Sequence, residues 1–304
     1  MHLAIGSKFS QSLPSALPML SLPSCANRFC PRPPTLWQRW WARNEGIRLY
    51  DDWFCSPECF TAGLSSGLEI ELRASVSTQP PKHRLPLGLI LLEQGLISHG
   101  ELQKALCYQR SGGRRRIGEW LVKMELVRPQ EVINALAVQQ NCPVFRSPAA
   151  PAFPDAMRFP VPLIRQYGGV PVYFNAGGNC LYLGFCGPLH RPLLRAAEQL
   201  MRCRIEPCIV SGASHRRALQ HWETSMRGEA ITFAQRQSQR EMVRTICGYA
   251  EQTGASACSV ARCHDYLWTR LYGDLGSLDL LFRVSSEPAA DLASSDFETE
   301  FALI

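Results

Sequence analysis

LGLILLEQGLISHGELQKALCYQ, residues 87–109, is followed 30 positions later by a second copy, IGEWLVKMELVRPQEVINALAVQ, residues 117–139. Glycine and leucine recur at matching positions near the start of each copy, and apolar residues then follow at the spacings i, i+3 and i+4 that are typical of a helix. Each copy therefore predicts a short helix, a turn and a second helix. Together the copies predict two helical hairpins packed on each other.

Local signals mark where the second helix of each copy begins. Ser98 and Glu101 form a capping box, in which the two side chains bond the first free amides of a helix. In the other copy Pro129 stands at the first helical position, where its missing N–H costs nothing.

Residues after the repeat predict a small α/β unit. Two apolar runs, 170–174 and 180–185, are joined by a Gly-Gly turn and predict a β-hairpin. Pro188 suits the first turn of a helix, a strand follows over 205–210, and a last helix reaches about Trp222. A helix between two strands of one sheet indicates a crossover connection.

The repeat and the motifs that follow it resemble a known family. Residues 84–225 carry, in order, the double Gly-x-x-Leu repeat, Phe159-Pro-Val-Pro162, Gly169-Val-Pro-Val172 and Arg204-Ile-Glu-Pro207. This order resembles the N-terminal domain of the ATPases that drive type II secretion and type IV pilus extension. Some of those domains bind cyclic di-GMP through two tandem Arg-Leu-Gly-x-x-Leu motifs.

The resemblance implies eight candidate nucleotide-binding residues, four from each copy. They are Arg84, Leu87, Gly88 and Leu91, and Arg116, Ile117, Gly118 and Leu121. The second copy keeps the motif, whereas the first has Pro86 in place of the motif arginine, with Arg84 two residues upstream. An alternative interpretation is that the glycines and leucines only pack the hairpins and that the arginines form a solvated turn.

The sequence lacks the motor of such an ATPase. A phosphate-binding loop needs Gly-Lys followed by Ser or Thr, and the dipeptide Gly-Lys occurs nowhere in the chain. ATP hydrolysis by that route is excluded, and we find no other set of catalytic residues. We interpret the protein as a non-enzymatic regulator or adaptor whose partners are cyclic di-GMP or a secretion or pilus assembly protein.

Four of the thirteen cysteines predict a structural zinc site. Cys25, Cys30, Cys55 and Cys59 follow the spacing C-x4-C-x24-C-x3-C, two short knuckles at the separation of a zinc finger. The second knuckle looks like that of treble-clef fingers, in which the last ligands lie at the start of a helix. Four unrelated thiols are the alternative.

The predicted zinc finger suggests an alternative function, that of a zinc-finger nucleic-acid-binding protein. Trp37, Trp40 and Trp41 lie between the knuckles with arginines beside them. Tryptophans in so small a unit more often cover the metal, and the net charge of +6 is not gathered in one basic stripe. These observations argue against nucleic acid as the partner.

The expected fold class is α+β, in five parts along the chain. They are a disordered leader (1–22), a zinc-finger-like segment (23–73), the secretion-ATPase-like domain (84–226), a small C-terminal domain (229–285) and an acidic tail (286–304). The C-terminal domain is expected to combine one helix with a three-stranded antiparallel sheet over 257–263, 266–272 and 278–284. No window suits a membrane-spanning helix, and we expect a cytoplasmic protein.

Overall fold

The computed structural model describes residues 24–31, 46–74, 84–111, 115–146, 153, 158–225, 230–274 and 276–284. The expected leader, the three tryptophans between the knuckles and the acidic tail lie outside these residues. The described chain is α+β, with one six-stranded and one three-stranded sheet, as the fold class predicted. No helix among the described residues is long and apolar enough to cross a membrane.

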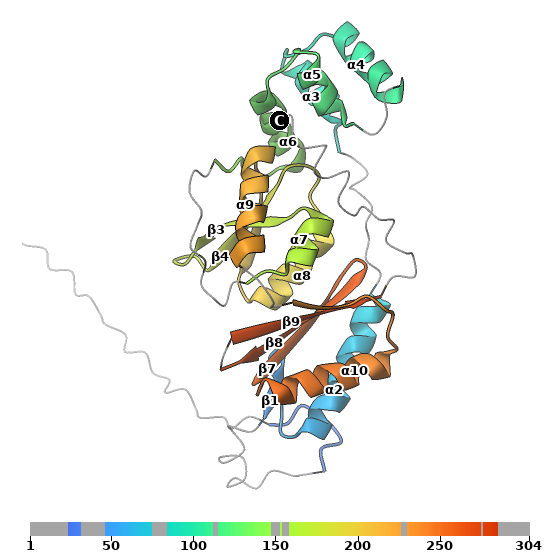
Figure 1. The fold of residues 1–304 in the computed structure, drawn as a ribbon, viewed down its shortest axis with the longest axis vertical. Helices are drawn as coiled ribbons and strands as arrows, with labels where there is room; N and C mark the ends of the chain where they lie inside the picture. The colour runs from blue at the N-terminus through green and yellow to red at the C-terminus, as the bar shows by residue number, and fades with distance from the viewer. Residues whose placement is uncertain are drawn as a thin grey trace, which may run out of the picture.

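Three tiers follow one another along the longest axis (Figure 1). The helical hairpins stand at one end, the three-stranded unit lies in the middle, and the six-stranded sheet with two helices forms the other end.

The helical hairpins match the repeat. Each copy gives a seven-residue helix, a turn and a longer helix, namely α3 (Leu87–Glu93), α4 (His99–Ser111), α5 (Ile117–Lys123) and α6 (Pro129–Gln140). The Ser98 backbone N–H donates to Glu101 Oε2 at 2.7 Å and the Glu101 N–H donates to Ser98 Oγ at 3.3 Å, which confirms the capping box. The apolar faces of all four helices meet in one small core.

The middle tier is the predicted α/β unit. Its strands, in the order β3-β4-β5, are β3 (Val170–Asn175), β4 (Cys180–Phe185) and β5 (Arg204–Ile209). β3 pairs antiparallel with β4, and β4 pairs parallel with β5 through the crossover helix α8 (Arg191–Met201). Helices α7 (Val161–Tyr167) and α9 (Gly212–Ser225) pack against each other, and Trp222 Nε1 donates to the carbonyl of Pro171 at 3.0 Å.

The third tier joins two segments that the sequence analysis treated separately. The strands lie in the order β2-β1-β7-β8-β9-β6. They are β1 (Ile47–Leu49), β2 (Asp52–Phe54), β6 (Ala230–Phe233), β7 (Ala257–Cys263), β8 (Tyr266–Gly273) and β9 (Gly276–Arg283). The predicted meander is present as β7-β8-β9, but the hairpin of the zinc-finger segment extends it through parallel pairing of β1 with β7.

A physical reason explains the joining of these segments. A hairpin of two three-residue strands is marginal alone in water. Helix α2 (Pro57–Arg73) lies beside α10 (Gln239–Gln252), and both cover one face of the six-stranded sheet (Figure 1). Leu64 and Leu68 of α2 are fully buried there in the same core as Ile246 of α10.

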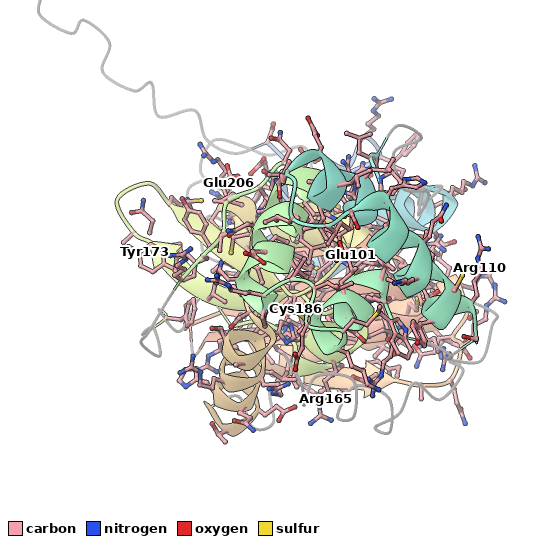
Figure 2. All side chains as sticks on the ribbon, turned by 90° about the horizontal axis from the view of Figure 1, so that it is seen from above. Glu101, Arg110, Arg165, Tyr173, Cys186 and Glu206 are labelled. Atoms are coloured by element: carbon pink, nitrogen blue, oxygen red, sulfur yellow. The ribbon has the colours of Figure 1, made fainter. Side chains whose placement is uncertain are left out.

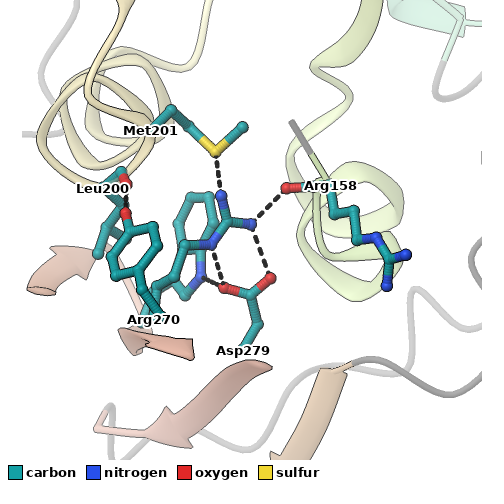
Figure 3. Close-up of polar contacts among 7 residues, drawn as sticks. Arg158, Leu200, Met201, Arg270 and Asp279 are labelled. Carbon is teal, nitrogen blue, oxygen red and sulfur yellow. Dashed lines mark hydrogen bonds and ion pairs between the residues drawn. The ribbon is translucent and has the colours of Figure 1, made fainter. Parts of the chain in front are cut away.

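The opposite face of this sheet packs on α8 of the middle tier. Trp268 on β8 and Leu281 on β9 belong to one core with Leu193 and Leu200. A polar network crosses this interface (Figure 3). Arg270, which is fully buried, contacts the carboxylate of Asp279.

The guanidinium and the carboxylate of this pair also form hydrogen bonds with other residues. Arg270 Nε and Nη2 donate to the two oxygens of Asp279 at 2.8 and 2.7 Å, and Trp268 Nε1 donates to Oδ1 at 2.7 Å. The guanidinium also donates to the carbonyl of Arg158 and to the sulfur of Met201, which belong to the middle tier. The ion pair thereby holds the six-stranded sheet to the α/β unit.

Candidate functional site

The structure brings the four predicted metal ligands together. The Sγ atoms of Cys25, Cys30, Cys55 and Cys59 all lie within 4.8 Å of one another. Cys30 Sγ is 3.4 Å from Cys55 Sγ, and Cys55 Sγ is 3.9 Å from Cys59 Sγ. A tetrahedral zinc ion with Zn–S bonds of about 2.3 Å separates its sulfurs by about 3.8 Å. The donor set therefore fits a four-thiolate metal site.

Three local features place these thiols. Cys55 directly follows strand β2, and Cys59 lies in the first turn of α2, where the Cys59 backbone N–H donates to Oγ of the N-cap residue Ser56. The first knuckle is attached to the hairpin by the Ala26 N–H, which donates to the carbonyl of Trp53 at 2.9 Å. This arrangement of hairpin and helix start is the one that the treble-clef resemblance implied.

The surroundings shift the pKa values of the cysteine thiols in different directions. Burial raises the pKa of Cys25 and, together with the neighbouring Cys30, that of Cys55. Burial also acts to raise the pKa of Cys59, but hydrogen bonds from Asn27, whose Nδ2 lies 3.3 Å from the sulfur, and from Ser56 outweigh it and lower the pKa. A cation at the centre would favour the thiolate form of all four.

Most of the candidate nucleotide-binding residues lie inside the hairpins. Leu87, Leu91 and Leu121 are buried in the helical core, and Gly88 and Gly118 are buried beside them. The glycines allow close packing of the helices. A Cβ atom added at Gly88 would lie 2.6 Å from Leu102 Cδ1, and one added at Gly118 would lie 2.9 Å from Val132 Cγ1. Ile117 is half-buried at the start of α5.

Arg116, in contrast, is exposed and reaches the middle tier. It is the N-cap residue of α5, and a Cβ added at Gly187 would clash with Arg116 Nη1. Burial raises the pKa of the adjacent Cys186 to about 11, and the positive charges of Arg116 and Arg216 act in the opposite direction. Both guanidinium groups therefore lie near the start of the segment 186–191, which leads into α8.

The first-copy arginine reaches the other end of this segment. Arg84 donates through Nη2 to Oε1 of Gln140, which is buried at the end of α6. Burial and, second, the charge of Arg191 lower the pKa of Arg84. Arg191 is the first residue of α8. Arg84 and Arg116 thus approach the two ends of segment 186–191.

Sequence reasoning missed Gly187, Arg191 and Arg216 as neighbours of this site. Gly187-Pro188 was visible as the start of a helix, but only the packing of the hairpins on the α/β unit brings it to Arg116. Glu119 also lies in this environment, where its negative charge acts on Cys186.

The comparisons with known proteins gave matches among solved structures. No family model matches the sequence, and no curated protein matches it. Over 46% of its length the chain is similar to the structure of MshE with cdg, at 24% identity and a TM-score of 0.39, covering 99% of that chain. Two structures of the N-terminal domain of XpsE match over 48% of this chain and 99% of theirs, at 15% identity and TM-scores of 0.35 and 0.27.

All three TM-scores lie below 0.5, so a function for this chain has to come from its own residues.

Proposed function

We propose that this protein is a non-enzymatic, cytoplasmic regulator or adaptor of type II secretion or type IV pilus assembly. Its helical hairpins and α/β unit bind cyclic di-GMP, and the bound state is read by a secretion or pilus assembly protein. One observation supports this proposal above the others. Arg84 precedes the first repeat copy, Arg116 occupies the motif position of the second, and both approach the same segment, 186–191.

The charge of this region suits a ligand with two phosphates. Arg116 and Arg216 lie near one end of the segment, and Arg84 and Arg191 near the other. Arginine binds phosphate oxygens in pairs and stacks on flat rings, so it serves both the phosphate and the guanine parts of a cyclic dinucleotide. MshE has been seen with cdg, and the transfer of that ligand to this chain is part of the proposal.

The resident metal is assigned as Zn²⁺ with a structural role. Four thiols with no histidine, no carboxylate and no fifth donor among the described residues match the closed Cys₄ sites that zinc forms. Bound zinc would supply a tetrahedral crosslink. Cys25 and Cys30 would attach the first knuckle to Cys55 after β2 and to Cys59 in α2.

Isothermal titration of the full-length protein with cyclic di-GMP tests the nucleotide site. We expect saturable binding that Arg116→Ala weakens at least tenfold, because the substitution removes the guanidinium beside Gly187. Arg110→Ala is the matched control, since Arg110 is an exposed arginine at the end of α4, well away from Cys186 (Figure 2).

The nucleotide part of the proposal would be overturned if the full-length protein gave no heat of binding in the titration and also bound no radiolabelled cyclic di-GMP that unlabelled nucleotide displaces. Equal losses in the Arg116 and Arg110 variants would overturn the location. Steady ATP turnover by the purified chain would contradict the non-enzymatic role.

A further inference from the structure

A pocket of about 380 Å³ opens at the far edge of the third tier, away from the sites described above. It lies where the end of α2, the start of α10, strand β7 and the end of β9 meet. Its apolar lining comes from Leu72, Met242 and Val284.

Five polar side chains complete the lining, and the two charged ones among them, Arg236 and Arg262, are both arginines. Arg262 directs Nη1 to the carbonyl of Leu72 at 2.7 Å and Nε to that of His264 at 3.2 Å, which fixes its guanidinium in the wall. Arg236 is exposed at the mouth of the pocket and makes no ion pair within the described part of the chain. Gln237 Oε1 is buried and accepts no hydrogen bond from any described residue.

The start of α10 does not itself provide the anion site. Its first free amides are already capped, because Ser238 Oγ accepts from the Glu241 N–H and Glu241 Oε2 accepts from the Ser238 N–H at 2.7 Å. The groups in the pocket that a ligand could contact are therefore the two arginines and the Gln237 Oε1 acceptor, which has no donor among the described residues.

A complementary occupant needs three properties. It must carry negative charge for Arg236 and Arg262, a hydrogen-bond donor for Gln237 Oε1, and an apolar group for the lining. An acidic peptide segment has all three, since its backbone N–H groups donate and its carboxylates and apolar side chains supply the rest.

The chain provides such a segment next to the pocket. Residues 285–304 follow Val284 directly and carry five acids and no base, at positions 287, 291, 296, 298 and 300. Glu287 is three residues past Val284, three extended residues span about 10 Å, and Val284 lines the same pocket as both arginines. A short tether gives an effective concentration on the order of millimolar, so even a weak charge pairing is populated.

We infer that the acidic segment 285–304 docks in this pocket, with Glu287 paired to Arg236. The contact covers the corner formed by α2, α10 and β9. It is separate from the nucleotide and metal sites.

Hydrogen–deuterium exchange on the full-length protein tests the docking. The reference is a free peptide of residues 285–304. We expect backbone amides of residues 286–292 to exchange at least fivefold more slowly in the protein than in the peptide. Arg236→Ala should return them to the peptide rate, and 1 M NaCl should do the same because exposed ion pairs are screened.

Arg240→Ala is the matched control, since Arg240 is an exposed arginine in the first turn of α10, four residues after Arg236, but does not line the pocket. The charge swap Arg236→Glu with Glu287→Arg should restore slow exchange that either single substitution abolishes. Exchange at the peptide rate in the unmodified protein would overturn the inference. So would equal effects of the Arg236 and Arg240 substitutions, or failure of the charge swap to restore protection.

Discussion

Replacing Asp279 by asparagine isolates the contribution of the buried ion pair within the six-stranded sheet, at its interface with the middle tier. The side chain keeps its shape and one acceptor oxygen, but the negative charge is lost and an amide N–H₂ faces Arg270 Nη2, which now lies 2.7 Å from a carboxylate oxygen. Arg270 and Asp279 are 0% and 4% exposed. An uncompensated buried charge typically costs about 3–5 kcal/mol. We expect Asp279→Asn to lower the free energy of unfolding by about 3 kcal/mol.

Urea titration of the full-length protein, followed by circular dichroism, measures this loss. With a slope of about 3 kcal/mol per molar, the midpoint should fall by about 1 M. Glu206→Gln serves as the control, because it breaks the Arg204–Glu206 pair, whose side chains are 68% and 37% exposed. Such surface pairs contribute about 0–1 kcal/mol. If the two substitutions shift the midpoint equally, the buried pair does not hold the tiers together as described.

The remaining predictions concern the cysteine cluster, one turn and one histidine. Cys59→Ser removes a proposed ligand and a core side chain, so the zinc content, measured by atomic emission, and the thermal midpoint should both fall. Cys107 is exposed, and Cys107→Ser should change neither quantity. Full zinc content in the Cys59 variant would contradict the site. Glu125 has a φ of 57°, a left-handed conformation that favours glycine, so Glu125→Gly should raise the free energy of unfolding in urea by about 1 kcal/mol. Gly95 has a φ of 68°, and Gly95→Ala should lower that free energy by a similar amount. A destabilised Glu125 variant would refute this reasoning. Burial lowers the pKa of His190 to about 4, so below pH 6.5 the unfolded chain takes up the proton first and stability falls as the pH falls toward 4. His190→Asn keeps an N-cap acceptor and should flatten that part of a plot of urea midpoint against pH; an unchanged slope would show that other groups cause it.

Features set by local sequence were predictable. The 30-residue repeat gave both hairpins, and even its irregularity has a structural counterpart. Glu125 stands where the first copy has Gly95, and it adopts the same left-handed backbone conformation. The spacing alone predicted that the four cysteines would lie together, because two short knuckles leave few ways to arrange four thiols.

Features set by distant packing were not predictable in the same way. A three-residue strand such as β1 carries too little pattern to reveal that its partner is β7. The pairing depends on Leu49 and Phe54 entering a core with α10, which nothing in the segment itself encodes. Arg191 likewise gained its place near Arg84 only through the docking of the hairpins on the α/β unit.

The pairing of β1 with β7 also bears on the order in which parts of the protein fold during synthesis. Arg48 lies opposite Ala257, more than 200 positions later in the chain. At a translation rate of about 5–20 residues per second, the partner strand follows by about 10–40 s. All four cysteines are already present by residue 59. We therefore expect that, on the ribosome, zinc capture orders the first knuckle and hairpin and shields their apolar side chains until the strand that completes their core has been made.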